Sequence, residues 1–217
     1  GNTTQGTFTP FSQTGWGNYF DGTGDYLSIG TASNLNLSSN NWTIEGWVYI
    51  AANTGSEQYI LSSGNSSWQS GACAIHYSPS LNKIGILAYD YDGGGGSYVC
   101  SAPISTLNTW YHVAFTRSSN TISCYLNGTL TGTGTTSISW NFNSNNATYI
   151  ARVGWASGYT VNGYISNLRM VNGSVVYSSN FTPSTTPLTA ITNTALLTCQ
   201  SNRFIDNSAN AYSITCL

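Results

Sequence analysis

Turn-forming residues divide this sequence into short segments, and this constrains the fold most. Gly and β-branched residues interrupt every window in which a helical stripe of apolar residues might run. The segments between the turns are short and apolar or alternating, which predicts many strands packed as a sandwich or barrel. The expected strands are Tyr19–Phe20, Tyr26–Ile29, Trp42–Ile50, Tyr59–Leu61, Ala72–Tyr77, Ile84–Tyr89, Tyr98–Cys100, Trp110–Thr116, Thr121–Leu126, Tyr149–Val153, Val161–Val171, Ala195–Cys199 and Tyr212–Ile214.

The composition is polar but almost uncharged, and this excludes several classes of partner. Asn, Ser and Thr account for 83 of the 217 residues, and only 6% of residues are charged. Five Lys and Arg residues against seven Asp and Glu cannot form the cationic surface that nucleic acid or an anionic membrane requires. An aromatic content of 13% supplies enough apolar surface to fold the chain. No apolar run approaches the length of a membrane span, so we expect no membrane insertion.

Strand signals continue from end to end without a change in composition, which predicts one domain over residues 1–217. The chain begins at Gly1 rather than Met, so we expect a processed product or one module of a longer polypeptide. Five cysteines are an odd number, so at least one thiol is free or pairs with another chain, and their spacing does not indicate zinc. The pairing of the five is left open by the sequence: Cys73, Cys100, Cys124, Cys199 and Cys216.

Three Asn-Gly pairs indicate hairpins, because both residues tolerate the positive φ of a type I′ turn. They are Asn127-Gly128, Asn162-Gly163 and Asn172-Gly173. The Asn127-Gly128 pair is the strongest of the three hairpin signals.

Four sequence blocks, taken in order, resemble a known family. They are Tyr19–Leu27 (YFDGTGDYL), Trp42–Val48 (WTIEGWV), Trp110–Arg117 (WYHVAFTR) followed by Tyr125–Gly128 (YLNG), and Gly163–Met170 (GYISNLRM). Together they resemble the laminin-G-like branch of the concanavalin A-like lectin/glucanase superfamily. The resemblance implies an all-β fold, an antiparallel β-sandwich of the concanavalin A-like jelly-roll type.

The Asn/Ser/Thr/Gly-rich texture, with the runs Ser166–Arg169 and Asn202–Ser208, also resembles laminin-G-like modules of bacteriophage virion proteins. That likeness implies a module at the virion surface, hence extracellular, that meets other virion proteins or copies of itself and recognises host-surface glycans. The alternative is a purely structural protein of capsid decoration or of tail or fibre assembly, acting through protein–protein contacts.

The sequence does not predict an enzyme. Glucanases of the superfamily place two carboxylates on one strand, whereas here Glu45 stands alone and Glu57 lies in a polar loop. Glu45 is interpreted as a carboxylate hydrogen-bonded among polar groups. His76 and His112 lack a recognisable nucleophile and orienting carboxylate, and they are interpreted as a surface or packed residue and a packed strand residue respectively.

Calcium is the candidate cofactor, because relatives often bind one ion at the rim of the sandwich through oxygen ligands. The resemblance assigns Asp25 and Asn167 as its tentative ligands. Asn167 stands near the position where relatives often carry Asp, so this site has lost a charge. The acidic segment 90–94 has a similar alternation, and turn-capping is the alternative role for both places.

A glycan site needs aromatic rings to pack against a sugar and polar groups to pair its hydroxyls, and several loops combine the two. The alternative is that the rings only plug the ends of the sandwich. The candidate glycan-binding residues are Trp68, Tyr89, Asp90, Tyr91, Asp92, Trp155 and Tyr159.

Overall fold

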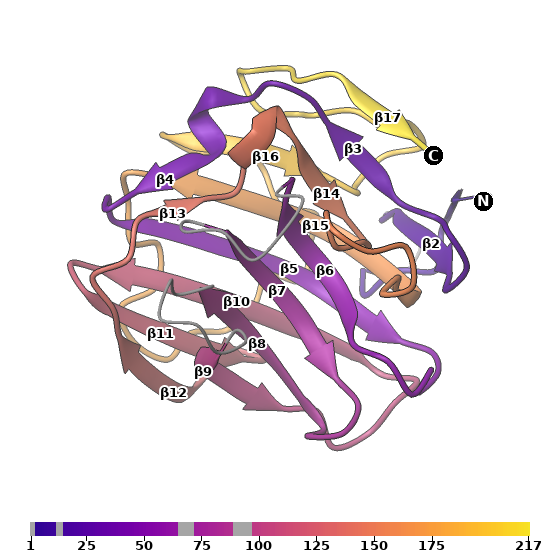
Figure 1. Cartoon of the computed structure of the whole chain (residues 1–217), viewed down its shortest axis with the longest axis horizontal. Helices are drawn as coiled ribbons and strands as arrows, with labels where there is room; N and C mark the ends of the chain where they lie inside the picture. The colour runs from indigo at the N-terminus through magenta and orange to yellow at the C-terminus, as the bar shows by residue number, and fades with distance from the viewer. Residues whose placement is uncertain (1–2, 12–14, 65–71, 89–96) are drawn as a thin grey trace.

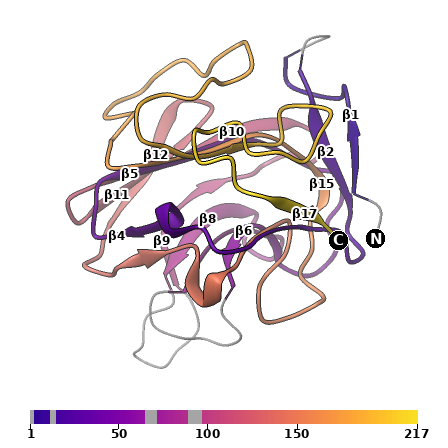
Figure 2. The ribbon, with the colours of Figure 1, turned by 90° about the horizontal axis from the view of Figure 1, so that it is seen from above.

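The computed structural model describes residues 3–11, 15–64, 72–88 and 97–217. These residues form two stacked antiparallel sheets, as Figures 1 and 2 show, so the predicted all-β sandwich is confirmed. Every predicted strand overlaps an observed one. The strands are β1 (Thr4–Gly6), β2 (Gly17–Asp21), β3 (Leu27–Ile29), β4 (Asn36–Ser38), β5 (Trp42–Ile50), β6 (Gln58–Ser63), β7 (Cys73–Ser78), β8 (Lys83–Ala88), β9 (Ser97–Pro103), β10 (Trp110–Ser118), β11 (Thr121–Leu126), β12 (Thr129–Thr135), β13 (Trp140–Asn141), β14 (Thr148–Ile150), β15 (Asn162–Asn172), β16 (Thr194–Thr198) and β17 (Ile214–Cys216), with short 3-10 helices η2 (Ser33–Leu35) and η3 (Ser144–Asn146).

The first layer, here called the β5 sheet, has the strand order β1-β2-β15-β5-β10-β11-β12. Strand β15 lies beside β5 along its length, while its other edge pairs first with β2 and then with β16. The register against β5 shifts between Ser166 and Arg169, where Asn167 takes a φ of 54°. This bulge lets one strand serve two neighbours on the same edge.

The second layer, here called the β7 sheet, has the order β17-β3-β14-β6-β7-β8-β9. Its inner side chains meet those of the β5 sheet in one apolar core, in which the Trp42 and Trp140 rings pack edge to face at 5.3 Å. A further short pair, β4 with β13, lies at the end of the sandwich. In the described part of the chain, no helix is long and apolar enough to cross a membrane.

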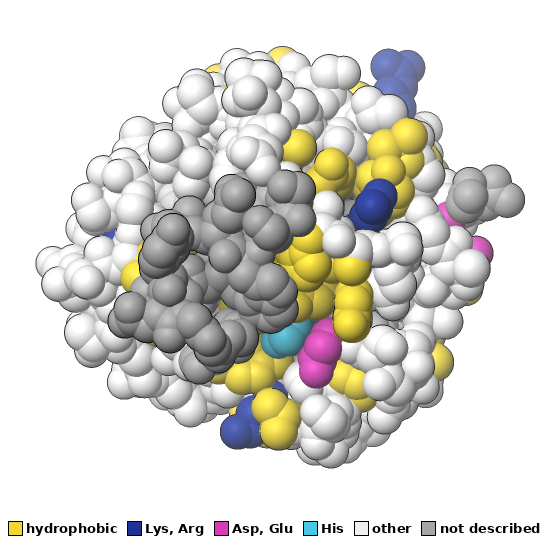
Figure 3. All heavy atoms as spheres, in the orientation of Figure 1, with side chains coloured by type: hydrophobic (Ala, Val, Ile, Leu, Met, Phe, Trp, Pro, Cys, Tyr) yellow, Lys and Arg dark blue, Asp and Glu magenta, His cyan; other side chains and the backbone are white. Residues whose placement is uncertain are grey.

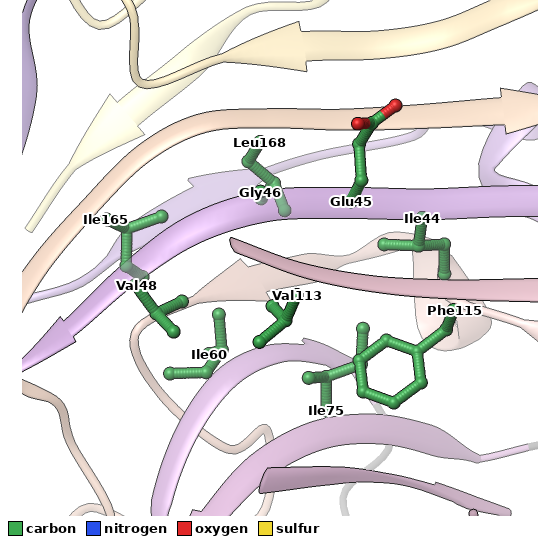
Figure 4. A pocket seen from close by; sticks show the side chains of 10 residues that line it. All are labelled: Ile44, Glu45, Gly46, Val48, Ile60, Ile75, Val113, Phe115, Ile165 and Leu168. Carbon is green, nitrogen blue, oxygen red and sulfur yellow. The ribbon is translucent and has the colours of Figure 1, made fainter. Parts of the chain in front are cut away.

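The core contains a small cavity of about 10 Å³ between the two sheets. Aliphatic side chains and Phe115 line it, and Figure 4 shows the Glu45 carboxylate pointing away from them. A space of this size is at the lower limit for one water molecule. It is therefore a packing gap and is too small for a ligand.

Of the three hairpins predicted at Asn-Gly pairs, one is confirmed and two are wrong. Asn127 and Gly128 form the two-residue turn between β11 and β12, with φ of 49° and 80°, so this hairpin is confirmed. The prediction is wrong for Asn162-Gly163, which lies inside β15. It is also wrong for Asn172-Gly173, which ends β15 and leads into a long connection. Pairing to β5 and β2 uses Asn162 and Gly163 as strand residues, which overrides the local turn preference.

The connection from 173 to 193, here called the strap, crosses the outer face of the β5 sheet (Figure 2). It is held there by a buried polar network around Glu45, whose carboxylate accepts hydrogen bonds from Arg169 Nε at 3.0 Å and from the Tyr177 hydroxyl at 2.7 Å. Arg169 also donates to the Thr189 carbonyl of the strap. The five cysteines are all free, and only Cys216 is exposed.

Candidate functional site

The candidate site lies on the outer face of the β7 sheet, which faces the viewer in Figures 1 and 3. Along β7, Ile75 and Tyr77 point into the core, so the alternation of a strand turns Ala74, His76 and Ser78 to the outer face. On this face Ala74 joins a second, smaller apolar cluster, formed with Tyr59, Ala72, Leu87 and Val153. The members of this cluster are 0–6% exposed, so it is a packed cluster and not an open apolar patch.

His76 is the central side chain of this face. Its ring lies between Tyr59 and Tyr98, at centroid distances of 4.8 and 4.9 Å. The side chain is only 9% exposed, and neither ring nitrogen has a hydrogen-bond partner among the described residues. Burial lowers the pKa of His76 to about 4, so the imidazole is neutral at neutral pH and presents one donor and one acceptor.

Glu57 lies beside His76 and supplies the carboxylate of the site. Its Oε2 atom is 3.6 Å from His76 Nδ1, and its Oε1 atom accepts a hydrogen bond of 3.0 Å from the Ser78 hydroxyl. Burial raises the pKa of Glu57, and the bond from Ser78 opposes that shift. In the space-filling view, an acidic side chain and a histidine lie side by side among hydrophobic side chains (Figure 3).

Tyr98 closes the site on the β9 side, and a glycine makes room for it. A Cβ atom on Gly85 of β8 would collide with the Tyr98 ring, so only glycine lets the ring lie flat on the neighbouring strand. The Tyr98 hydroxyl is buried and has no partner at normal hydrogen-bond geometry among the described residues. The nearby Ser78 hydroxyl lowers its pKa slightly. Burial and the nearby Glu57 carboxylate raise that pKa, so the hydroxyl keeps its proton.

The loop between β14 and β15 brings two more rings. Trp155 and Tyr159 meet the Tyr59 ring at 5.8 and 6.1 Å, both nearly perpendicular to it. The loop is fixed to β6, because the Tyr59 amide donates to the Tyr159 carbonyl and the Ala151 amide donates to the Ile60 carbonyl. Trp155 is half-buried against the outer apolar cluster, whereas Tyr159 is 38% exposed.

These side chains are here called the His76 site: Glu57, Tyr59, His76, Tyr98, Trp155 and Tyr159. The site combines rings with buried polar atoms that lack regular hydrogen bonds, namely Glu57 Oε2, both His76 nitrogens and the Tyr98 hydroxyl. Buried polar atoms without partners are costly, so a surface that retains several of them together is suited to a ligand that pairs them. Rings that pack C–H groups beside groups that pair hydroxyls are what a sugar requires.

The sequence predicted part of this arrangement. Trp155 and Tyr159 were both candidates, and the structure brings them together at the Tyr59 ring. The other five candidates lie outside the described residues: Trp68, Tyr89, Asp90, Tyr91 and Asp92. Sequence reasoning missed Glu57, Tyr59 and Tyr98, and His76 proved to be buried rather than a surface residue. The alternation along Ala72–Tyr77 was a signal that one polar side chain faces outward there.

The two tentative calcium ligands have different surroundings. Asp25 is fully buried, accepts a hydrogen bond from the Asp21 amide and leaves its Oδ1 atom without a partner. The Asn167 side-chain oxygen, Oδ1, already accepts hydrogen bonds from the Leu188 amide and from Gln200 Nε2. Among the described residues, no three His, Cys, Asp or Glu side chains gather in a way that could hold a metal. Calcium binding stays a prediction, with Asp25 as its better candidate.

Glu45 is the carboxylate whose interpretation is confirmed. It is bonded to Arg169 and Tyr177 as described above, and His112 Nε2 lies 3.2 Å from its Oε2 atom. His112 is 1% exposed, as expected for a packed strand residue. This network is closed to solvent beneath the strap, so it has no space for a substrate.

A family model described as the concanavalin A-like lectin/glucanases superfamily, of laminin G type, matches residues 21–178. The chain belongs to this superfamily. Its matched region contains Glu57, Tyr59, His76, Tyr98, Trp155 and Tyr159, so the His76 site lies within the family domain. Among curated proteins, none matches the sequence.

Solved structures share this concanavalin A-like fold at low sequence identity. A Bacteroides ovatus protein assigned as carbohydrate-binding superposes with a TM-score of 0.62 at 17% identity, over 99% of this chain and 60% of its own. The CBM40 module of the Ruminococcus gnavus IT-sialidase superposes with a TM-score of 0.57 at 12% identity, over 75% of this chain and 92% of the module. Domain 4 of the Geobacillus stearothermophilus arabinanase AbnA, solved with arabinotriose, gives 0.57 at 15% identity, over 80% and 76%. This chain therefore spans about 60% of the length of the Bacteroides protein.

Proposed function

We propose that this domain is a non-catalytic carbohydrate-binding module and that the His76 site is its glycan site. The observation that carries the proposal is the set of buried, unpaired polar atoms on His76 and Glu57 between the rings of Tyr59 and Tyr98. Carbohydrate-binding modules among the structures of similar fold support it. Glu45 supports non-catalytic action. It is the carboxylate on the strand that resembles the glucanase strand, and both of its oxygens are already bonded to Arg169, His112 and Tyr177.

A glycan array with the isolated domain, followed by titration calorimetry with the sugars that bind, tests this proposal. Tyr98→Phe removes one hydroxyl from the site and should weaken binding by several-fold. Tyr49→Phe removes one hydroxyl from the opposite sheet, where it bonds to Asn108, and serves as the matched control. If both variants weaken binding equally, or if neither does, the glycan binds elsewhere. Unchanged melting temperatures would show that both variants fold.

The biological setting that we propose is adhesion at a virion surface, where the module would bind host glycans. The support is the nearly uncharged Asn/Ser/Thr-rich composition, with 6% charged residues. Labelling of intact particles by antibodies raised against the domain would support this setting. Particles that carry the protein but are not labelled would count against surface exposure.

A structural role through protein–protein contacts is the second candidate, and a separate surface favours it. Phe8, which is 46% exposed, packs on Tyr49, Trp110 and Tyr164 at 4.7–5.6 Å on the outer face of the β5 sheet. Exposed aromatic clusters of this kind are frequent at interfaces. If a second copy covers this face, sedimentation should show association that Phe8→Ser weakens. A monomer at all concentrations would argue against it.

A further inference from the structure

Glu57 is the charged side chain of the His76 site at neutral pH. Its side chain is 32% exposed and its Oε1 atom accepts a hydrogen bond from Ser78, which favours the ionised form, whereas Oε2 is buried. His76 adds no positive charge there, since burial lowers its pKa to about 4. A ligand that bonds to His76 must therefore approach a negative charge, because Glu57 Oε2 lies 3.6 Å from His76 Nδ1.

The hydrogen-bonding groups of the site also favour hydroxyl groups over a carboxylate. Glu57 Oε2 accepts only, the neutral His76 ring offers one donor and one acceptor, and the Tyr98 hydroxyl does both. A sugar hydroxyl can donate to Glu57 and accept from a neighbour. A ligand carboxylate has acceptors alone, so it would leave Glu57 Oε2 unpaired as well as repelled.

The chain holds five Lys and Arg residues, and none of them forms an ion pair with Glu57. Arg169 is paired with Glu45, and Arg117, on β10 of the opposite sheet, donates to the backbone carbonyls of Ser38 and Ile138. Arg152 stacks on Tyr26 and Tyr149, at 4.5 and 5.6 Å from the ring centroids. Lys83 is exposed on the outer face of the same sheet, opposite Ser78 in the register of β8 with β7, but it forms no ion pair with a described carboxylate; Arg203 lies near the C-terminus. The site thus lacks the guanidinium fork that usually binds a carboxylate.

We infer that the His76 site takes an uncharged sugar and discriminates against a carboxylated one, such as sialic acid or a uronic acid. This specificity rests on the function proposed above. It differs from the CBM40 module of similar fold, which was solved with sialyllactose. A ligand carboxylate bonded to His76 would lie roughly 6 Å from Glu57, which weakens binding by about a hundredfold at the effective dielectric of a protein surface.

Matched sugar pairs test this inference: glucose with glucuronic acid, galactose with galacturonic acid, and lactose with 3′-sialyllactose. Affinities are measured by titration calorimetry or by ligand-observed NMR for the wild-type domain. Glu57→Gln removes the charge at constant shape, Arg152→Gln removes the cation nearest to the loop of Trp155, and His76→Phe removes the polar centre of the site. Thermal melting of each variant confirms folding.

We expect the neutral member of a binding pair to bind at least about tenfold more tightly, and Glu57→Gln to reduce that ratio to within about threefold. Arg152→Gln should leave the ratio unchanged. Equal or tighter binding of the acidic member, abolished by His76→Phe, would overturn the charge inference while keeping the glycan site. Binding of acidic sugars that is lost in Arg152→Gln would overturn the charge inference as well. If no sugar binds, or if His76→Phe binds as the wild type does, the proposed function itself fails.

Discussion

Replacing Glu45 by Gln should destabilise the domain strongly, although Glu45 lies far from the His76 site. The Glu45 side chain has no exposed surface, and its carboxylate is bonded to Arg169 Nε, His112 and the Tyr177 hydroxyl. Gln keeps the shape and one acceptor oxygen. It removes the charge that offsets the buried guanidinium of Arg169, which is itself 6% exposed.

The expected cost follows from this burial. Removing one partner of a buried ion pair typically costs about 3–5 kcal/mol, and the oxygen that remains in Gln places this variant near the lower value, about 3 kcal/mol. For a domain of this length, each kcal/mol lowers the melting temperature by roughly 2–4 °C, so the loss should be about 6–12 °C. The strap should loosen too, because Tyr177 and Thr189 are tied to the same network.

The cost should depend on pH in a definite direction. Burial alone would raise the pKa of Glu45, but the His112 hydrogen bond and the Arg169 charge outweigh it, so the pKa is lowered below 4.5. A carboxylate whose pKa is lower in the folded state contributes its full stabilisation when the pH is above the unfolded-state pKa. The stabilisation is lost as the pH falls through the folded-state pKa. The difference between wild type and Glu45→Gln should therefore be full at pH 7 and shrink below pH 4.5.

Urea denaturation and calorimetry at pH 7 and in acid measure this effect, and protease digestion reports on the strap. Glu57→Gln is the matched control, because it changes a carboxylate that is 32% exposed and lacks an arginine partner among the described residues. A Glu45→Gln domain that melts within about 1 °C of wild type at pH 7, or a difference that grows in acid, would refute the reasoning.

Four further changes have definite expected outcomes. His76 titrates near pH 4 in the fold against 6.5 when unfolded, so the unfolding free energy should fall by about 3 kcal/mol as pH drops across that window, and His76→Gln should flatten the slope measured by urea denaturation. Gly85→Ala should push Tyr98 off β8 and reduce glycan binding in calorimetry while far-UV circular dichroism stays native; unchanged affinity would remove Tyr98 from the site. Gly128→Ala should lower stability by roughly 1–3 kcal/mol, because φ is 80° there and a Cβ would meet the Phe181 carbonyl, and thermal melting checks it. Calcium should raise the melting temperature, by about 2.7 kcal/mol of stability at a hundredfold excess over Kd, and Asp25→Ala should abolish the rise; melting that ignores both calcium and chelator would reduce Asp25 to a turn residue.

The strands were predictable because alternation and turn residues are local properties of the sequence. Two kinds of element were not. Strands β1, β4, β12 and β13 were missed, β12 because Thr and Gly fill Thr129–Thr135 apart from the exposed Leu130, so only its pairing with β11 reveals it. The Asn162-Gly163 and Asn172-Gly173 turns were wrong because tertiary pairing of β15 outweighs local turn preference.

The candidate site was predictable only in its loop aromatics. Trp155 and Tyr159 stand in a Gly-rich turn, where exposed rings are conspicuous. Tyr59 and His76 come together through the register of β6 with β7, in which they are direct partners. Tyr98 joins them because Gly85 leaves its place on β8 open. Both relations depend on the register between paired strands, which cannot be read from a single sequence.

The pairing of β15 with β5 has a consequence for how the chain acquires its structure. These neighbours in the middle of the β5 sheet are more than 110 residues apart in sequence, as the partners Ile50 and Gly163 show. The middle of that sheet therefore cannot form until β15 has been synthesised and has left the ribosome. Closing so long a loop before any contact compensates it makes folding slow, in the millisecond-to-second range of β-sandwiches. Until then the edge of β5 that pairs with β15 has no partner, and the low charge of the chain gives it little protection from pairing with another copy.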